Sequence, residues 1–401
     1  MSARWTTQDF PVGFLSLHPD RGINFQLNRL YNFSNDPVLL AALRDCASAI
    51  GDYDDLARSL EDLGRSALAE GHTLRAALCF RGAEFALPAG NAQRSGLRHE
   101  FIALSNAYYG IDDTAHHTIP FLDTTLSAYR FGAQNPKGTI VFLNGFDGYI
   151  EELTRVFLVF RDAGYDVIAF DGPGQGAVLE ETGTPMTPTW EKPTGAVLDH
   201  FGLQDVTVVG CSLGGCLALR ASAFEPRISR TICFDILPSL FESVLHVAPA
   251  SLKRLLSSAL PRNIGRGIIN RLLTRAARQN LTVQWGLRQG MHVMGVATPY
   301  DFLRASLQFD TASWSPSIRQ DVLLLAGAED HYVPQGQLAV QIDGLTRTRS
   351  LTARLFTAEE QASNHCQLGN IGLALDTMLD WMNRLDASQE RLSLALAPQE
   401  V

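Results

Sequence analysis

The chain has 401 residues, 46% of them hydrophobic and 19% charged, enough to bury the core of one large domain and a smaller one. A formal net charge of −9 argues against nucleic acid or an anionic membrane as a partner, so we expect a small-molecule substrate. No signal-peptide pattern, no membrane-length apolar run and no Cys-x-x-Cys pair among the six cysteines is visible. These features predict a cytoplasmic protein with reduced thiols and no metal site.

The first part of the chain has a helical pattern. Apolar residues recur at three- and four-residue spacing, and Asp, Asn or Ser residues that suit N-caps lie near several expected starts. We therefore expect a helical domain over 1–115. The aromatic residues of segment 1–31 could pack on a second subunit, so a homodimer is a further expectation. Helices are predicted over 36–50, 52–69, 72–85 and 94–109.

Beyond about residue 119, short β-branched runs alternate with helical segments. This alternation is typical of an α/β protein with right-handed crossovers and a mostly parallel, doubly wound sheet that helices cover on both faces. The predicted strands are 125–131, 138–143, 167–170, 206–209, 231–234, 322–326 and 351–356, and the predicted helices are 150–163, 188–200, 214–223 and 370–385.

One interval breaks this alternation. Nearly 90 residues with an amphipathic helical pattern separate the strand that ends at 234 from the next strand, too many for one crossover. We expect an inserted helical cap over 237–315, which divides the α/β core into 116–236 and 316–388. The polar, Ala-rich segment 389–401 is expected to be a flexible tail.

The clearest chemical pattern is Gly-Cys-Ser-Leu-Gly at 210–214, where an apolar strand stops and a helix begins. A serine between glycines on such a tight turn projects its hydroxyl out of the backbone and leaves the next N–H facing the same space. Ser212 is therefore the candidate nucleophile, and the N–H of Leu213 is a candidate oxyanion donor. The simpler interpretation is an ordinary strand–helix loop, because the bare pattern is common by chance.

A serine nucleophile needs a base, and the base needs a third group that orients it. The loop after the predicted strand 322–326 contains Asp330, which we assign as the orienting acid. Two alternatives stay open. Asp330 could instead cap the helix that begins near Pro334, and Glu329 could supply the carboxylate.

His365 lies between the last predicted strand and the final helix and is the candidate base. A lone histidine is more often structural than catalytic, so the assignment depends on this position. His331 and His246 are the alternative bases. His331 stands beside the acid and could not easily bond it while reaching Ser212.

Two glycine-containing loops follow earlier strands. In Asn144-Gly145-Phe146, the glycine allows a close turn, so the N–H of Phe146 is the expected second oxyanion donor; each such donor is worth roughly 3 kcal/mol of barrier. Asp-Gly-Pro-Gly-Gln-Gly at 171–176 invites a phosphate-loop interpretation, but its spacing fits no nucleotide motif and Pro173 lacks an N–H. We interpret it as a rigid turn that lines the pocket floor.

Side chains of the expected cap and of the loop around Phe146 could line a pocket. Each one alone is better explained by packing in the core. Together they indicate an enclosed apolar cavity suited to an aromatic or polyketide-like molecule. The candidate pocket residues are Asp147, Tyr149, Phe241, His246, Trp285 and His292.

Gly-Cys-Ser-Leu-Gly, Asp-Gly-Pro-Gly-Gln-Gly, Gly-x-x-Asp-x-x-Val-Pro and the late histidine together resemble the α/β-hydrolase superfamily. The N-terminal helices and the 171–176 loop resemble the branch that holds 2,6-dihydropseudooxynicotine hydrolase. Asn-Gly-Phe-Asp-Gly-Tyr at 144–149 resembles the matching loop of the fungal heptaketide (yellowish-green) hydrolases. The resemblance implies an α/β-hydrolase fold, no cofactor, and hydrolysis of a carbon–carbon bond next to a ketone. It also implies an additional acid after the sixth strand, for which Glu242 and Asp235 are the candidates.

Three functions remain open. The leading hypothesis is a serine hydrolase that cleaves a carbon–carbon bond in a polyketide-like or aromatic β-diketone. The second is an ester, lactone or thioester hydrolase, or an acyl transferase or cyclase, that uses the same side chains. The third is a non-catalytic protein that binds a small ligand on a hydrolase scaffold.

Overall fold

A computed structural model describes residues 4–246 and 248–396. An eight-stranded sheet in the order β1-β2-β4-β3-β5-β6-β7-β8 forms its centre. Strands β3 to β8 pair in parallel, whereas β1 and β2 run antiparallel along one edge. The mostly parallel sheet predicted from the sequence is confirmed. The strands are β1 His116–Phe121, β2 Thr124–Phe131, β3 Thr139–Leu143, β4 Asp166–Asp171, β5 Val206–Cys211, β6 Ile228–Phe234, β7 Asp321–Gly327 and β8 Ser350–Phe356.

Helices cover both faces of the sheet. Because side chains alternate along a strand, Ile140 and Phe142 of β3 belong to one apolar core and Val141 and Leu143 to the other. The first core includes α6 (Thr154–Asp162) and the start of α16 (Ile371–Leu396). The second includes α7 (Gly176–Thr182), α8 (Glu191–Phe201), α9 (Leu213–Phe224) and part of α15 (Gly336–Gly344).

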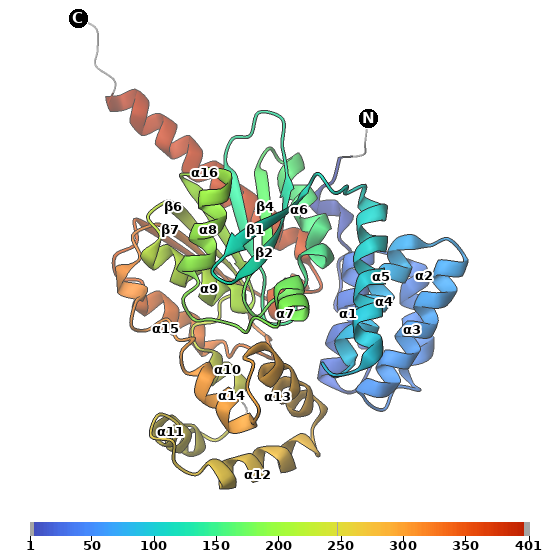
Figure 1. Cartoon of the computed structure of the whole chain (residues 1–401). Helices are drawn as coiled ribbons and strands as arrows, with labels where there is room; N and C mark the ends of the chain where they lie inside the picture. The colour runs from blue at the N-terminus through green and yellow to red at the C-terminus, as the bar shows by residue number, and fades with distance from the viewer. Residues whose placement is uncertain (1–3, 247, 397–401) are drawn as a thin grey trace, which may run out of the picture.

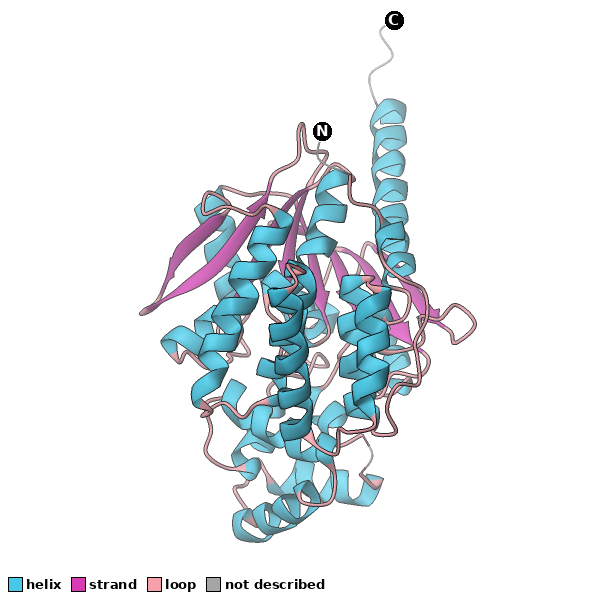
Figure 2. Cartoon of the chain, turned by 90° about the vertical axis from the view of Figure 1, so that its right-hand side faces the viewer, coloured by secondary structure: helices cyan, strands magenta, loops and turns pink. Residues whose placement is uncertain are grey.

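Five helices precede the sheet and stand together beside it (Figures 1 and 2). The side chains of Asp36 and Asp52 accept hydrogen bonds from the first backbone N–H groups of α2 and α3, as expected for N-caps. The apolar core of these helices is continuous with the first core of the sheet. The helices are α1 Arg21–Ser34, α2 Pro37–Ala47, α3 Tyr53–Ala69, α4 Thr73–Ala86 and α5 Ala92–Tyr109.

A second group of helices is inserted between β6 and β7 and lies at the bottom of Figure 1. It has a small core of its own that includes Phe241, Leu256 and Tyr300. No residue of α12 is buried, so this group is attached mainly through α10, α13 and α14. The helices are α10 Leu240–Val244, α11 Ala250–Ala259, α12 Arg266–Ala277, α13 Leu281–Val293 and α14 Pro299–Ser306.

The structure contains elements that were not predicted. Strand β1 was not predicted, because Pro120 interrupts its pattern; a proline is tolerated here since β1 is an edge strand. The segment 389–401 was expected to be a flexible tail; α16 continues to Leu396, residues 397–401 lie outside the described part, and the flexibility of this segment stays a prediction. Ile371, Met378 and Trp381 anchor its first turns in the core, and the chain carries no glycine or proline between Gly372 and Pro398 to stop the helix.

None of the helices in the described part of the chain combines the length and hydropathy that a bilayer span requires.

Candidate active site

Ser212 lies between the end of β5 and the start of α9, with φ +59° and ψ −123°, a conformation that non-glycine residues rarely adopt. A Cβ at Gly210 would come within 1.9 Å of the carbonyl oxygen of Gly214. A Cβ at Gly214 would come within 2.5 Å of the carbonyl oxygen of Leu143. Both flanking positions therefore require glycine, and the tight turn expected from the sequence is present.

The structure brings Ser212, Asp330 and His365 together in one chain of hydrogen bonds. His365 Nε2 lies 2.7 Å from Ser212 Oγ, and its Nδ1 lies 2.5 Å from Asp330 Oδ2. A carboxylate only accepts hydrogen bonds, so Nδ1–H donates to Asp330 and Nε2 is left to accept from the serine hydroxyl. The other oxygen of Asp330 accepts from the backbone N–H of Tyr332 at 2.7 Å and of Val333 at 3.0 Å.

Burial and the neighbouring charges shift the pKa values of Asp330 and His365 in opposite directions. Burial alone would raise the pKa of Asp330, but the adjacent imidazole and the two N–H donors hold it below its ordinary value. Burial alone would lower the pKa of His365, but the carboxylate of Asp330 outweighs it and raises that pKa well above 6.5. The arrangement favours an ionised Asp330 and a more basic His365.

A second carboxyl group, Asp235, lies beside this pair. It follows β6, is fully buried, and accepts hydrogen bonds from Gln367 Nε2 at 3.1 Å and from the backbone N–H of Cys366 at 3.3 Å. Burial and the nearby charge of Asp330 raise the pKa of Asp235 to about 8. This shift favours the neutral form of Asp235, which would add no second negative charge next to His365.

The alternative acid and bases have other partners. Glu329 accepts a hydrogen bond from the Ser363 hydroxyl at 2.7 Å. His331 packs against Tyr332 with tilted rings whose centroids are 3.8 Å apart, and burial lowers its pKa to about 3, so this ring stays neutral. His246 Nδ1 lies 3.1 Å from the backbone carbonyl of Ser243.

The loop after β3 packs directly on the turn at Ser212. A Cβ at Gly145 would come within 2.9 Å of Ser212 Cβ, so this approach too requires glycine. Among the described residues, no hydrogen-bond partner occurs for the N–H of Phe146 or of Leu213. Both expected oxyanion donors are thus unpaired, and Phe146 and Ser212 are only partly buried.

The N-terminal helices hold this loop through buried ion pairs. Arg29 of α1 contacts Asp147 at 2.8 Å and Glu152 at 2.5 Å, and Arg81 of α4 contacts Glu152 at 3.0 Å. Burial would raise the pKa of Asp147, but Arg29 and Arg81 hold it below its ordinary value. Because arginine stays charged and its planar fork suits two carboxylates, these contacts join the helical domain firmly to the residues after Phe146.

Aromatic side chains from separate parts of the chain surround the site. Phe25 of α1 packs edge-on against Tyr332 at 5.7 Å and lies 6.4 Å from the ring of His365. Trp285 of α13 stacks on Phe85 of α4, with ring centroids 4.8 Å apart. The N-terminal helices and the inserted helices therefore meet each other as well as the sheet.

Several expected site residues are engaged elsewhere. Tyr149 is buried and donates to Glu84 at 3.1 Å, and His292 lies 2.8 Å from Glu180. Phe241 belongs to the core of the inserted helices. Glu242 forms an ion pair with Lys253 at 3.0 Å with 45% of its side chain exposed, whereas the other candidate for the additional acid, Asp235, lies beside His365.

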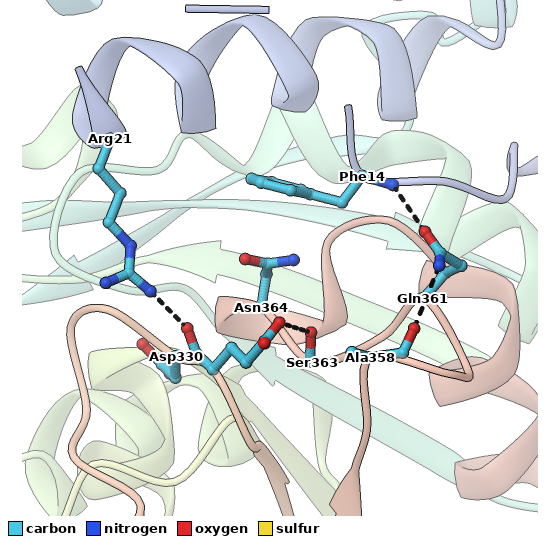
Figure 3. Close-up of a pocket in the computed structure, with 8 residues that line it drawn as sticks. Phe14, Arg21, Asp330, Ala358, Gln361, Ser363 and Asn364 are labelled. Carbon is cyan, nitrogen blue, oxygen red and sulfur yellow. Dashed lines mark hydrogen bonds between the residues drawn. The ribbon is translucent and has the colours of Figure 1, made fainter. Parts of the chain in front are cut away.

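A cavity of about 560 Å³ lies behind the acid, between the N-terminal segment and the loops after β7 and β8 (Figure 3). Arg21 and Phe14 lie on one side of it, and Asp330 and Asn364 on the other. Arg21 donates to the carbonyl oxygen of Glu329 at 2.8 Å. Neither Ser212 nor His365 lines this cavity, so it reaches the hydrogen-bonded chain only through Asp330.

Two buried glutamines next to the site were not predicted as part of it. Gln367 holds Asp235, and Gln175, in the loop at 171–176, holds the loop after β3. A glutamine in the sequence does not by itself indicate a role in a site, and the bonding partners of these two glutamines come from distant segments. Only its position in a glycine-rich loop could have drawn attention to Gln175.

Residues 138–366 match the sequence profile of the alpha/beta hydrolase fold family, and the chain belongs to this family. It is a hydrolase. Among its relatives, the "Hydrolyase poxO" of Penicillium oxalicum is 28% identical over 291 residues, which cover 66% of this chain and 68% of poxO. The "20-hydroxy-prefusarin hydrolase FUS2" of Gibberella moniliformis is 29% identical over 256 residues, 60% of each chain.

Solved structures agree on the fold. A 2,6-dihydroxy-pseudo-oxynicotine hydrolase matches with a TM-score of 0.60 at 21% identity, over 88% of this chain and 94% of the other. AbyA5 matches with a TM-score of 0.62 at 14% identity, over 88% and 95%. Both matches extend well beyond the α/β core, so the N-terminal helices are part of a shared architecture.

Proposed function

We propose that this hydrolase uses Ser212 as its nucleophile, His365 as its base and Asp330 as the orienting acid. We further propose that it cleaves a carbon–carbon bond next to a ketone in a polyketide-like or aromatic β-diketone. The observation that carries the proposal is the unbroken hydrogen-bonded chain from Ser212 Oγ through His365 to Asp330, with steps of 2.7 and 2.5 Å. Such spacing lets one proton move from the serine to the imidazole as the hydroxyl attacks.

In the first step, Ser212 Oγ forms a bond to one ketone carbon and its proton passes to His365 Nε2. The carbonyl π pair moves to oxygen, where the N–H groups of Leu213 and Phe146 stabilise the negative charge. When this intermediate collapses, the carbon–carbon bond breaks, and its electron pair leaves as the enolate of the second ketone. The imidazolium of His365 gives its proton to the enolate carbon.

In the second half, His365 takes a proton from water, and the resulting hydroxide attacks the acyl group on Ser212. The serine leaves with the proton from His365. The sum of both halves is one diketone and one water converted to one carboxylic acid and one shorter ketone. The chemistry needs only side chains, backbone donors and water.

The substrate class rests on the aromatic rings near the imidazole and on the family resemblance. The rings of Phe25 and Tyr332 lie 6.4 and 5.1 Å from the imidazole, so an aromatic ring or a fused ring system would find apolar partners there. The second candidate is hydrolysis of an ester, lactone or thioester, or acyl transfer, which the same hydrogen-bonded chain supports equally well.

The two candidates differ in their products. We expect the protein to convert 1-phenyl-1,3-butanedione to a carboxylic acid and a methyl ketone, and Ser212→Ala to abolish this conversion. Ser222→Ala is the matched control, because that buried hydroxyl in α9, the helix that follows Ser212, bonds to Ala218 O and Thr231 instead. Cleavage of simple esters alone would overturn the carbon–carbon assignment in favour of the second candidate. Full activity of Ser212→Ala would overturn the serine mechanism, and ligand binding without turnover would indicate the non-catalytic alternative.

A further inference from the structure

The glycine-rich loop at 171–176 has no role in the chemistry described so far. Its glycines are explained by close packing: a Cβ at Gly172 would come within 2.6 Å of Trp190, and one at Gly174 within 2.5 Å of Met186. At Gly176 the added Cβ would come within 1.8 Å of the Asp171 carboxylate. The loop is therefore rigid, and packing alone leaves Gln175 without an explanation.

Gln175 is 2% exposed and uses both ends of its amide. Its Nε2 donates to the carbonyl oxygen of Asn144 at 2.7 Å and to that of Gly145 at 3.0 Å. Its Oε1 accepts from the N–H of Gly172 at 3.2 Å. Carbonyl oxygens only accept and N–H groups only donate, so these partners fix which way the amide faces.

The two carbonyl groups that Gln175 binds belong to the turn that carries the second oxyanion donor. The carbonyl of Gly145 and the N–H of Phe146 share one planar trans peptide and point in opposite directions. A donor that holds this carbonyl from one side therefore aims the N–H of Phe146 toward the other side. Gly145, in the same turn, packs on Ser212 Cβ.

The N–H of the preceding residue, Gly145, is not available as an oxyanion donor. The N–H of Gly145 donates to Asn144 Oδ1 at 2.8 Å and is therefore occupied. The N–H of Phe146, by contrast, has no partner among the described residues. The turn thus presents this N–H as a free donor, while Gln175 holds the carbonyls of Asn144 and Gly145.

We propose that Gln175 is a positioning residue that aims the N–H of Phe146 at the oxygen on which charge develops during attack by Ser212. This inference rests on the proposed function, since an oxyanion donor matters only if Ser212 attacks a carbonyl. Gln175 itself touches no substrate. Its effect falls on the transition state, because the donor bonds the oxyanion more strongly than the ground-state carbonyl.

The test replaces Gln175 with methionine, which has nearly the same shape but no donor. The matched control is Gln341→Met, because Gln341 is equally buried and bonds Thr311 and Ser315, which are not part of the site. The substrate is p-nitrophenyl acetate, which releases p-nitrophenolate when the serine is acylated and develops an oxyanion in both acylation and deacylation. We expect kcat to fall by about 10- to 100-fold in Gln175→Met with KM changed less than about 3-fold, and no such fall in the control.

Two further measurements separate positioning from a general structural role. The rate of covalent modification by a fluorophosphonate should fall in parallel with kcat, because phosphonylation develops charge on the same oxygen. Gln175→Glu, which keeps the shape but loses both N–H donors when ionised, should show the same loss and covers the case that Gln175→Met does not fold. A kcat within about 2-fold of the unmodified protein, or equal losses in Gln175→Met and Gln341→Met, would overturn the inference.

Failure of the proposed function would be visible in other measurements than failure of the inference about Gln175. If the diketone is not cleaved, the substrate assignment fails, but the ester and fluorophosphonate measurements still test Gln175. If Ser212→Ala keeps its ester turnover, the serine mechanism itself fails, whatever Gln175 does.

Discussion

The loops after β6 and after β7 each place one buried carboxyl group near the same imidazole, yet the two groups differ in charge. Single oxygens of Asp235 and Asp330 and one ring nitrogen of His365 all lie within 4.8 Å of one another. Asp330 bonds the imidazole and has a lowered pKa, whereas Asp235 bonds Cys366 N and Gln367 and has a pKa raised to about 8. The imidazole and two N–H donors hold the pKa of Asp330 down, whereas burial and the neighbouring charge of Asp330 raise the pKa of Asp235.

The largest difference between the two loops should appear in turnover. We expect Asp330→Asn to lower kcat by about 10³- to 10⁴-fold, because an amide no longer fixes the tautomer of His365 or stabilises its imidazolium. Steady-state kinetics on p-nitrophenyl acetate measure this effect. A loss below about 10-fold would mean that Asp235 can replace Asp330 and would remove the distinction between the two loops.

The pH dependence sharpens the same comparison. His365 must be neutral to act as a base, and Asp330 raises its pKa, so activity should rise with pH through a midpoint above 6.5. Removing the charge in Asp330→Asn should lower that pKa and move the acidic limb of the residual activity to lower pH. The profile of kcat/KM between pH 5 and 9 tests this, and a limb that stays in place would contradict it.

Asp235→Asn should have little effect on turnover, within about 3-fold, because Asp235 is already uncharged below its pKa of about 8. The substitution should instead change how the stability of the fold depends on pH. A carboxyl group whose pKa is raised by folding contributes stability at low pH, and this is lost as pH rises from its unfolded value near 4 to about 8.

The melting temperature of the original protein should therefore fall, relative to that of Asp235→Asn, between pH 5 and 8. Paired thermal melts at both pH values measure this difference. A constant difference across the range would show that Asp235 is ionised in the folded protein.

The smallest expected effect comes from Glu242. Its carboxylate is half exposed and pairs with Lys253, and such pairs are typically worth about 0.2–1 kcal/mol. Glu242→Gln should leave kcat unchanged and shift the free energy of unfolding by no more than this. A large loss of turnover would return Glu242 to the site as an additional acid.

The alternation of strands and helices and the turn at Ser212 follow from local patterns in the sequence. Gly210 and Gly214 mark the turn because each lies against backbone, and no larger residue fits there. The positions of Asp330 and His365 follow from the rule that loops at the carboxyl ends of parallel strands meet.

The remaining contacts depend on residues that are distant in the chain. Tyr149 bonds Glu84, 65 positions away, and His292 bonds Glu180, 112 positions away. Neither partner could be read from the neighbourhood of these aromatic residues, so both were predicted to line the pocket. The role of Gln175 was missed for the same reason, because its partners at 144 and 145 precede it by about 30 positions.

Covalent labelling tests the proposed nucleophile most directly. A fluorophosphonate should add one phosphonyl group to the folded protein, and peptide mass spectrometry should locate it on Ser212. The label should be absent in Ser212→Ala and form far more slowly in His365→Asn. A folded protein that takes no label, or takes it undiminished without this hydroxyl, would contradict the account.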